Sequence, residues 1–175
     1  MAKNNAWNDS LAKAKYAEAL TRQVFEKMGC MVTDVSNDPE YQKEDVDLVC
    51  TWNQEDTTVE SKSDDTYQYG NFAFETVKNT NTGELGWALT TTAQVITIYY
   101  PKVDVMYILD GQKTVDWFRE HQHEFREITN STARREGGVL YYSKFRTVNR
   151  KRFEKESGAV LSVFKPAEYL ASDAS

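Results

Sequence analysis

The stretch DVDLVCTWNQEDTTVESKS, residues 45–63, carries the clearest structural pattern in the chain. In residues 45–52 the side chains alternate between two faces: Val46, Leu48, Cys50 and Trp52 on one, and Asp45, Asp47, Val49 and Thr51 on the other. A period of two residues predicts a strand with its apolar face on a core. Residues 53–56 are typical of turns, and residues 57–63 form the next polar strand, so the stretch predicts an antiparallel hairpin.

A long amphipathic segment precedes this hairpin. In residues 10–28 apolar side chains recur at the spacing of one helix face. Ser10 or Asp9 can cap the start, and Gly29 is a usual C-terminal stop. We therefore expect a helix over residues 10–28, followed by a short strand at residues 30–36.

The segments after residue 63 add further strands and one helix. Apolar and β-branched runs predict strands at 71–77, 94–100, 103–109, 139–145 and 159–165. Apolar spacing predicts a helix over 114–127, and a short helical turn is expected at 87–92. The expected fold class is α/β, with a single mixed β-sheet flanked by helices. The length of 175 residues favours one domain spanning residues 1–175.

Composition narrows the class of protein. Hydrophobic residues make up 40% and aromatic residues 13% of the chain, which is enough to bury a core. The polar N-terminal sequence lacks the apolar run of a signal peptide, and no stretch has the roughly 18 apolar residues of a membrane span. Cys30 and Cys50 lie far apart and outside any CxxC pair, so we expect free thiols and a cytoplasmic setting.

Glu60 and Lys62 lie two positions apart in the second strand of the hairpin, so their side chains share one face. Two interpretations are open: an exposed ion pair worth well under ~1 kcal/mol, or one part of a metal-dependent active site. Asp47 on the neighbouring strand favours the second interpretation, because paired antiparallel strands bring such side chains within reach of one another.

The order of these residues resembles the PD-(D/E)XK nuclease superfamily. Asp47 is followed, after twelve residues, by the Glu-x-Lys triplet at Glu60 and Lys62. Glu18 stands eleven residues before Gly29 in the preceding helix. The pattern is nearest to archaeal Holliday-junction resolvases and small phage endonucleases. The resemblance implies a restriction-endonuclease-like core.

The resemblance covers residues 15–65 best and extends more weakly over residues 72–100. In the second region FAFETVKN, a Gly-Trp pair and AQVITIYY are similar to small phage nuclease-like proteins. Two positions depart from the pattern. Val46 precedes Asp47 where the motif's name has Pro, and Gln94 stands where such proteins often have Asp.

The resemblance implies a Mg²⁺-dependent deoxyribonuclease, with Mn²⁺ as a substitute, that hydrolyses phosphodiester bonds in branched or foreign DNA. The implied oxygen ligands are Asp47, Glu60, the backbone carbonyl of Ser61 and, through a water molecule, Glu18. Lys62 would contact the attacking water or a phosphate oxygen. By analogy with resolvases, which cut two strands symmetrically, we also expect a homodimer.

Four further residues are weighed as ligands. Asp45 shares the face of Asp47 and is a rival for the metal role. Glu75, on the next expected strand, is an extra candidate ligand or substrate contact. His121 and His123 fall in an expected helix at positions i and i+2, which do not share a face, so a surface or packing role is expected for both.

A basic segment interrupts an acidic chain whose net charge is −6. Residues 134–155 contain eight Lys or Arg and two Glu, a net charge of +6. A solvated face and a phosphate-contacting surface are both open interpretations. The DNA-binding candidates in the segment are Arg134, Arg135, Lys144, Arg146, Arg150, Lys151 and Arg152.

Two other classes of function are open from the sequence. One is a catalytically inactive nuclease-fold module that binds DNA or protein, which the acidic net charge favours slightly. The other is a phage-encoded protein that binds a host nuclease or replication factor. The aromatic residues, among them Trp87, Trp117, Tyr141 and Tyr142, are expected in the core rather than in a base-stacking platform.

Overall fold

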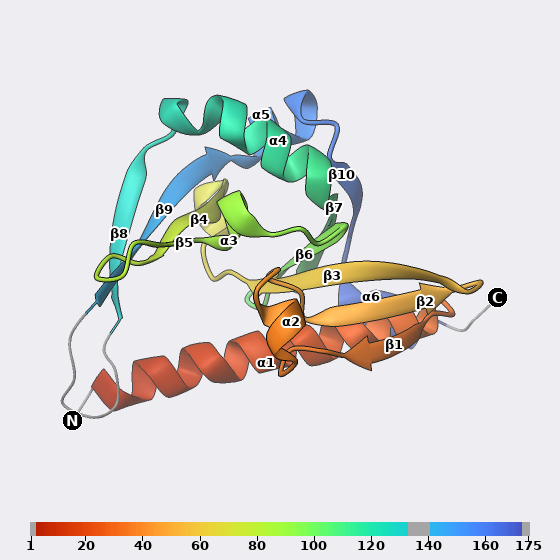
Figure 1. Cartoon of the computed structure of the whole chain (residues 1–175). Helices are drawn as coiled ribbons and strands as arrows, with labels where there is room; N and C mark the ends of the chain where they lie inside the picture. The colour runs from red at the N-terminus through yellow and green to blue at the C-terminus, as the bar shows by residue number, and fades with distance from the viewer. Residues whose placement is uncertain (1–2, 133–140, 173–175) are drawn as a thin grey trace.

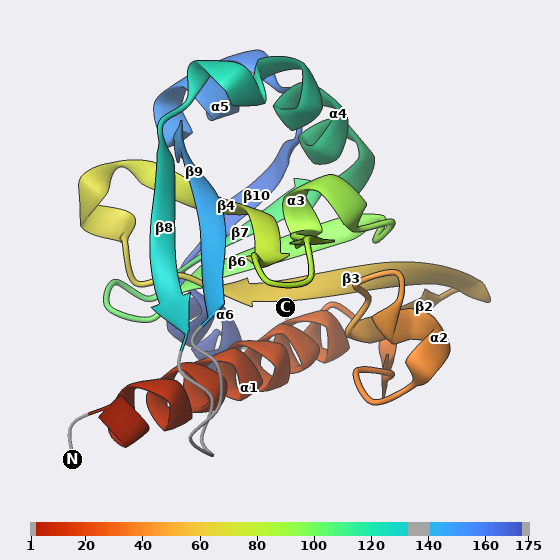
Figure 2. The same cartoon turned by 60° about the vertical axis from the view of Figure 1, so that its left-hand side comes forward.

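Two β-sheets and a long N-terminal helix form the framework of the protein (Figures 1 and 2). The computed structural model describes residues 3–132 and 141–172. The α/β class and the mixed sheet predicted from the sequence are confirmed, but a second sheet accompanies the one that was expected. Within the described ranges, no helix combines the length and the apolar character needed to cross a membrane.

The larger sheet has six strands in the order β1-β2-β3-β6-β7-β10. Its strands are β1 (Met31–Asp34), β2 (Leu48–Trp52), β3 (Glu55–Ser63), β6 (Val95–Tyr100), β7 (Val105–Asp110) and β10 (Val160–Phe164). Strands β3 and β6 are parallel, and every other neighbouring pair is antiparallel. The parallel pair requires a crossover, so the chain leaves the sheet after β3 and returns as β6.

The smaller sheet is built partly from this crossover. Its four strands pair antiparallel in the order β5-β4-β9-β8. They are β4 (Asn71–Asn79), β5 (Glu84–Leu85), β8 (Glu127–Thr132) and β9 (Tyr141–Asn149). Strand β8 was not predicted, because its sequence EITNST is polar and lacks an apolar face.

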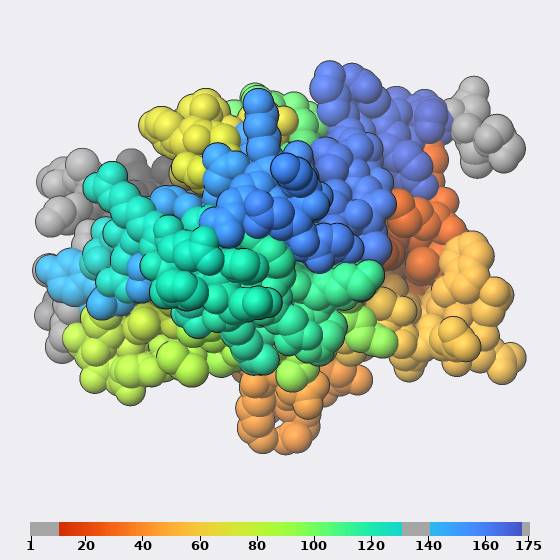
Figure 3. Space-filling model, turned by 90° about the horizontal axis from the view of Figure 1, so that it is seen from above, coloured from red at the N-terminus to blue at the C-terminus, as the bar shows by residue number. Residues whose placement is uncertain are grey.

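The structure describes six helices and two 3₁₀ turns. They are α1 (Lys3–Lys27), α2 (Pro39–Gln42), α3 (Trp87–Thr90), α4 (Gly111–His121), α5 (Arg150–Glu156) and α6 (Pro166–Ala171), with 3₁₀ turns η1 (Tyr67–Tyr69) and η2 (Gln122–Glu124). Helix α1 lies along the larger sheet, whereas α4 and α5 lie at the opposite end (Figures 1 and 2). Figure 3 looks down on the surface that α4 and α5 form.

Two hydrophobic cores lie on opposite faces of the larger sheet. On one face α1 packs Leu20 and Val24 against Met106. On the other face Phe72 and Phe74 of β4 lie in a large cluster of buried side chains. That cluster also contains Ile96, Ile98, Tyr107, Leu109, Trp87, Trp117 and Phe118. The larger sheet is therefore buried between α1 and the smaller sheet with α4.

The predicted hairpin forms with a tighter turn than expected. Asn53 and Gln54 alone connect β2 and β3, and both have positive φ angles, of 50° and 69°. Two such residues are characteristic of a type I′ turn. Trp52 is 51% exposed, so it does not join the buried apolar face that was predicted for it. Its ring lies over Gly29, where an added Cβ would approach the ring within 2.7 Å.

The expected helix boundaries shift in two places. Helix α1 begins at Lys3, before the cap predicted at Asp9 or Ser10, and ends as predicted before Gly29. The helix predicted for 114–127 starts earlier, where the Asp110 side chain accepts a hydrogen bond from the Lys113 N–H. It is followed by η2, and β8 already begins at Glu127.

Candidate active site

Asp47 occupies the place where β2 stops pairing with β3. The last pair of the ladder is Leu48 with Val59, so the final residues of β3 have no β2 strand opposite. The Asp47 N–H donates to the Val59 carbonyl at 2.9 Å. Asp47 Oδ2 accepts a hydrogen bond from the Ser61 N–H at 2.8 Å. The Asp47 carboxylate therefore accepts the hydrogen bond from the Ser61 N–H that a longer β2 strand would have accepted.

The backbone of Ser61 faces this opening, while its side chain faces the helix. In an antiparallel ladder the N–H and C=O of one residue point to the same side, so the Ser61 carbonyl is directed toward the Asp47 side. The Ser61 hydroxyl lies 3.1 Å from the Thr21 hydroxyl, which lies 3.0 Å from that of Thr97. All three residues are buried. This trio holds β3 to α1 and leaves Glu60 and Lys62 on the other face.

Glu60 and Lys62 form a buried ion pair at the centre of the site. Glu60 is 2% exposed, and its Oε1 contacts Lys62 Nζ. Glu60 Oε2 is also buried and has no hydrogen-bond partner among the described residues. Burial raises the pKa of Glu60, and the charges of Asp47 and Asp45 add to this rise against the opposing effect of Lys62.

The same carboxylates keep Lys62 protonated. Burial favours the neutral amine, but the charges of Glu60, Asp47 and Asp45 outweigh it and raise the pKa of Lys62. The Lys62 side chain is 31% exposed, so its ammonium group can reach a ligand. It is a cation at neutral pH, and it can donate hydrogen bonds but cannot accept a proton.

Glu18 lies on α1 and faces the same site. It lines a pocket of about 290 Å³ together with Asp47, Ser61 and Lys62. Burial and the nearby charge of Asp47 raise the pKa of Glu18. The sequence did not indicate the ion pair of Lys13 with Asp65, two residues that also line this pocket.

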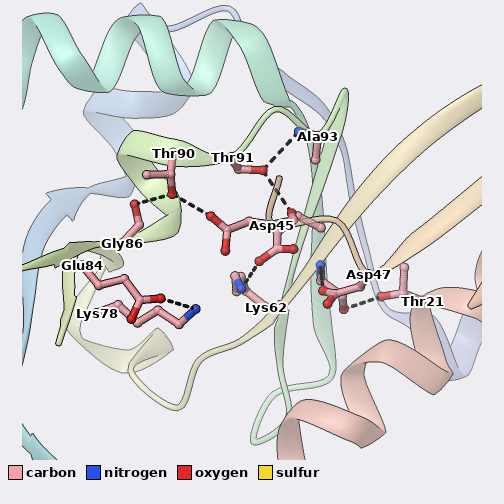
Figure 4. Close-up of polar contacts among 12 residues, drawn as sticks. Thr21, Asp45, Asp47, Lys62, Lys78, Glu84, Gly86, Thr90, Thr91 and Ala93 are labelled. Atoms are coloured by element: carbon pink, nitrogen blue, oxygen red, sulfur yellow. Dashed lines mark hydrogen bonds and ion pairs between the residues drawn. The ribbon is translucent and has the colours of Figure 1, made fainter. Parts of the chain in front are cut away.

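Asp45 and Glu75 are two further carboxylates that interact electrostatically with Lys62. Asp45 has a positive φ of 51°, and its Oδ2 accepts a hydrogen bond from Thr90 Oγ1 at 2.6 Å (Figure 4). This contact holds Asp45 against α3, away from the position that Asp47 occupies. Burial raises the pKa of Glu75, and the charges of Lys62 and Lys78 oppose that rise, which places Glu75 within the electrostatic reach of both lysines.

Three pockets meet at Lys62. The first is the pocket beside α1. The second, about 520 Å³, is lined by Asp45, Asp47, Glu60 and Lys78, and Figure 4 shows three of these residues around Lys62. The third, about 440 Å³, opens toward the smaller sheet. Lys62 is the residue that lines all three, so a ligand bound at its amine can extend in three directions.

The carboxylates offer oxygen atoms but do not form a cage. Within residues 3–132 and 141–172, no group of three or more His, Cys, Asp and Glu side chains is placed to hold a metal ion. Asp47 lines one pocket together with Glu60 and another together with Ser61, whose N–H donates to the Asp47 carboxylate. Two carboxylates and a carbonyl are the donor types that Mg²⁺ takes when water completes its coordination.

The basic side chains in the described part of the basic segment, residues 141–155, do not line the pockets at this site. Arg134 and Arg135 lie outside the described residues. Lys144 and Arg146 both pair with Glu127, and by strand alternation they lie on the opposite face of β9 from the pocket-lining residue Phe145. None of the described basic candidates lines the three pockets at Lys62.

The remaining basic candidates lie at the α5 end. Arg150 stacks on the ring of Tyr67 at 3.7 Å and donates a hydrogen bond to its carbonyl. Arg152 pairs with Glu124 and with Glu156. Lys151 is exposed. The two arginines therefore stabilise the turn and helices around α5, far from α1 (Figures 1 and 2).

Several residues of the site gave no signal in the sequence. Lys78 and Asn130 lie on strands of the smaller sheet, whose pairing was not predicted. Lys13 lies one position before Ala14, which shares a helix face with Glu18. His121 stacks on Trp117, in agreement with the packing role expected for it.

Comparisons with family models, with curated proteins and with solved structures found no match to the chain.

Proposed function

We propose that the chain is a metal-dependent DNA endonuclease of the PD-(D/E)XK type, with a restriction-endonuclease-like core. The observation that carries this proposal is the placement of Glu60. Its carboxylate is buried, one oxygen contacts Lys62, and the other has no partner among the described residues while it lies near Asp47. A buried carboxylate oxygen without a partner is costly, and a bound cation would remove that cost.

The donor set fits Mg²⁺ or Mn²⁺. Asp47, Glu60 and the Ser61 carbonyl would hold the ion, and Glu18 would bind it through a water molecule. Such an ion polarises a phosphoryl oxygen and lowers the pKa of a bound water. Asp45 is less suited to this role, because its carboxylate is already bonded to Thr90.

The charges of Lys62 and Glu18 assign them different roles in the proposed hydrolysis. Lys62 is an ammonium ion, so it neutralises charge on the phosphate and does not act as a base. Hydrolysis releases a proton from the attacking water, which a nearby carboxylate can accept. Glu18 is suited to accept this proton, because its raised pKa makes it a better base than an ordinary carboxylate and it lines the same pocket as Asp47.

Cleavage assays test the proposal. Plasmid, nicked, branched and single-stranded DNA would be incubated with the protein and Mg²⁺ or Mn²⁺. We expect cleavage of at least one substrate, and a loss of roughly 100- to 1,000-fold in Lys62→Ala. Lys102→Ala, an exposed lysine in the turn between β6 and β7, is the matched control. If the wild-type protein cuts none of the substrates, or if Lys62→Ala cuts as well as wild type, the proposal fails.

A second function is favoured by the closed Glu60–Lys62 pair. The pair already satisfies the lysine without any ligand, as expected of a nuclease-fold module that binds DNA or a host protein and has lost catalysis. Binding would then be unaffected by Asp47→Asn, and calorimetric titration with Mg²⁺ would show no site. A homodimer, a phage origin and a cytoplasmic setting are parts of the proposal that rest on the resemblance and on the free thiols.

A further inference from the structure

The pocket between Lys62 and the smaller sheet has largely apolar walls. It measures about 440 Å³, within the roughly 300–1,000 Å³ of small-molecule sites. Trp87 and Ile98 are buried residues of the lining, and Ile128 and Phe145 are half-buried. Ile128 and Phe145 are opposite one another in the β8–β9 ladder. Their side chains therefore form one continuous apolar surface inside the pocket.

Two hydrogen-bonding side chains in this pocket are available to a ligand. Asn130 is exposed and has no side-chain partner among the described residues, and Glu75 is half-buried on β4, where its hydrogen bond with the Ser143 side chain leaves further acceptor positions on the carboxylate. The other carboxylates in the lining are already engaged. Asp64 accepts hydrogen bonds from two backbone N–H groups and a hydroxyl, and Asp65 pairs with Lys13.

Charge determines what the pocket can hold. Lys62 is the one cationic side chain among the described lining residues and also lines the two other pockets, whereas Glu75, Asp64 and Asp65 are acidic. A phosphate is therefore favoured at Lys62 and disfavoured deeper in. A planar uncharged ring suits the apolar walls, and a carboxylate accepts hydrogen bonds from amino groups. Cytosine, adenine and guanine carry an exocyclic amino group, and thymine does not.

We propose that this pocket, called here the base pocket, holds one unpaired nucleobase of a DNA substrate and favours amino-bearing bases over thymine. The phosphate next to that nucleotide would lie at Lys62. This inference deepens the proposed function and rests on it. Bases in a duplex are stacked and cannot enter a pocket, so the substrate is single-stranded DNA or DNA with an unpaired nucleotide.

Equilibrium binding tests the base pocket without any cleavage. Fluorescein-labelled oligo-dC and oligo-dT would be titrated with the full chain in the presence of a chelator, and fluorescence anisotropy would give both Kd values. We expect oligo-dC to bind roughly tenfold more tightly than oligo-dT. Glu75→Gln should bring the two Kd values together, because the amide can also donate to thymine O4.

Phe145 provides the second arm of the test. Phe145→Ala should weaken oligo-dC binding by roughly five- to a hundredfold through lost stacking. Phe145→Leu keeps most of the volume, so it decides the matter if the alanine variant does not fold. Tyr142→Ala is the matched control: Tyr142 is an aromatic residue of the same strand, 46% exposed and on the opposite face, and its loss should leave both Kd values unchanged.

The outcomes separate the base pocket from the proposed catalysis. Equal binding of oligo-dC and oligo-dT by the wild-type protein would overturn the base pocket, even if the protein cuts DNA. Wild-type affinity in a folded Phe145→Leu variant would overturn it as well. Base discrimination that depends on Glu75, in a protein that cuts no DNA with Mg²⁺, would support the base pocket and overturn the hydrolase.

Discussion

At the end of β3 the acidic side chains outnumber the basic side chains that could pair with them. On β9 and α5, by contrast, most of the described basic side chains already contact a partner. Glu60 keeps a buried oxygen without a partner among the described residues. Lys144, Arg146 and Arg152 all pair with glutamates. Ion pairs between exposed side chains stabilise little, and such pairs must be broken before a ligand can bind. Buried atoms without a partner also occur in the basic region, at Arg146 Nε and Arg150 Nη1, so what distinguishes the β3 end is that its unpartnered atom is a carboxylate oxygen of a pocket-lining residue. A run of like charge is a weak sign of a binding site when its side chains already pair with glutamates.

The largest expected effect is the loss of DNA cleavage when a carboxylate at the β3 end, rather than a basic residue of β9, is replaced. Asp47→Asn should lower DNA cleavage by roughly 100- to 1,000-fold, because it removes a ligand charge, although the asparagine amide oxygen can still accept the hydrogen bond from the Ser61 N–H. Lys144→Ala should leave cleavage close to wild type, because Lys144 faces away from the pockets and pairs with Glu127. Rates at matched protein concentration would measure both. A larger loss of cleavage in Lys144→Ala than in Asp47→Asn would show that the functional surface lies on β9 instead.

Metal binding should stabilise the β3 end. At about 100 times its Kd, Mg²⁺ would add about 2.7 kcal/mol to the free energy of unfolding. The effect should be larger at pH 8 than at pH 5, because protons compete with the metal for carboxylates whose pKa values are raised. Chemical denaturation with and without Mg²⁺ measures it. An identical gain in Asp47→Asn would show that the ion binds elsewhere.

The buried hydroxyls of Thr21, Ser61 and Thr97 should contribute more to stability than the surface ion pairs of the basic region. Thr21→Val should destabilise the protein by about 1–3 kcal/mol, because both the Ser61 and the Thr97 hydroxyls lose their partner in a buried position. Arg152→Ala should cost less, because its ion pairs lie at the surface. Urea denaturation of both variants gives the order. If Thr21→Val left the free energy of unfolding unchanged, the three hydroxyls would not be what holds β3 to α1.

The smallest expected effect is a change in pH dependence. Burial raises the pKa of Glu60 above its ordinary value of 4.5, so its contribution to stability is fully present below about 4.5 and is lost as the pH rises through the raised pKa. Glu60→Gln removes this group, and its stability should therefore fall less than that of wild type over the same interval. Thermal unfolding midpoints at pH 5, 6.5 and 8 without added metal would show this. Parallel curves for the two proteins would contradict it.

Local patterns were sufficient for the parts of the fold whose partners lie close in the chain. The alternation in residues 45–63 predicted the β2–β3 hairpin, and the helical spacing before Gly29 predicted α1. The smaller sheet was missed because β4 pairs with β9 across a long stretch of chain. Pairing at such separation is set by tertiary packing, and a short polar strand such as β8 carries no periodic signal for it.

Strand periodicity in the sequence was enough to indicate which residue types could meet at β3. The spacing of Asp47, Glu60 and Lys62 along two strands predicted their proximity, because strand geometry has a fixed period. The tertiary structure alone decided that Glu60 is buried with an unpartnered oxygen and that Lys62 stays protonated. It also turned Phe145 toward Lys62 and the basic side chains of β9 away from it. The reason is physical: desolvation and charge neighbours depend on what packs around a group, and those neighbours come from distant segments of the chain.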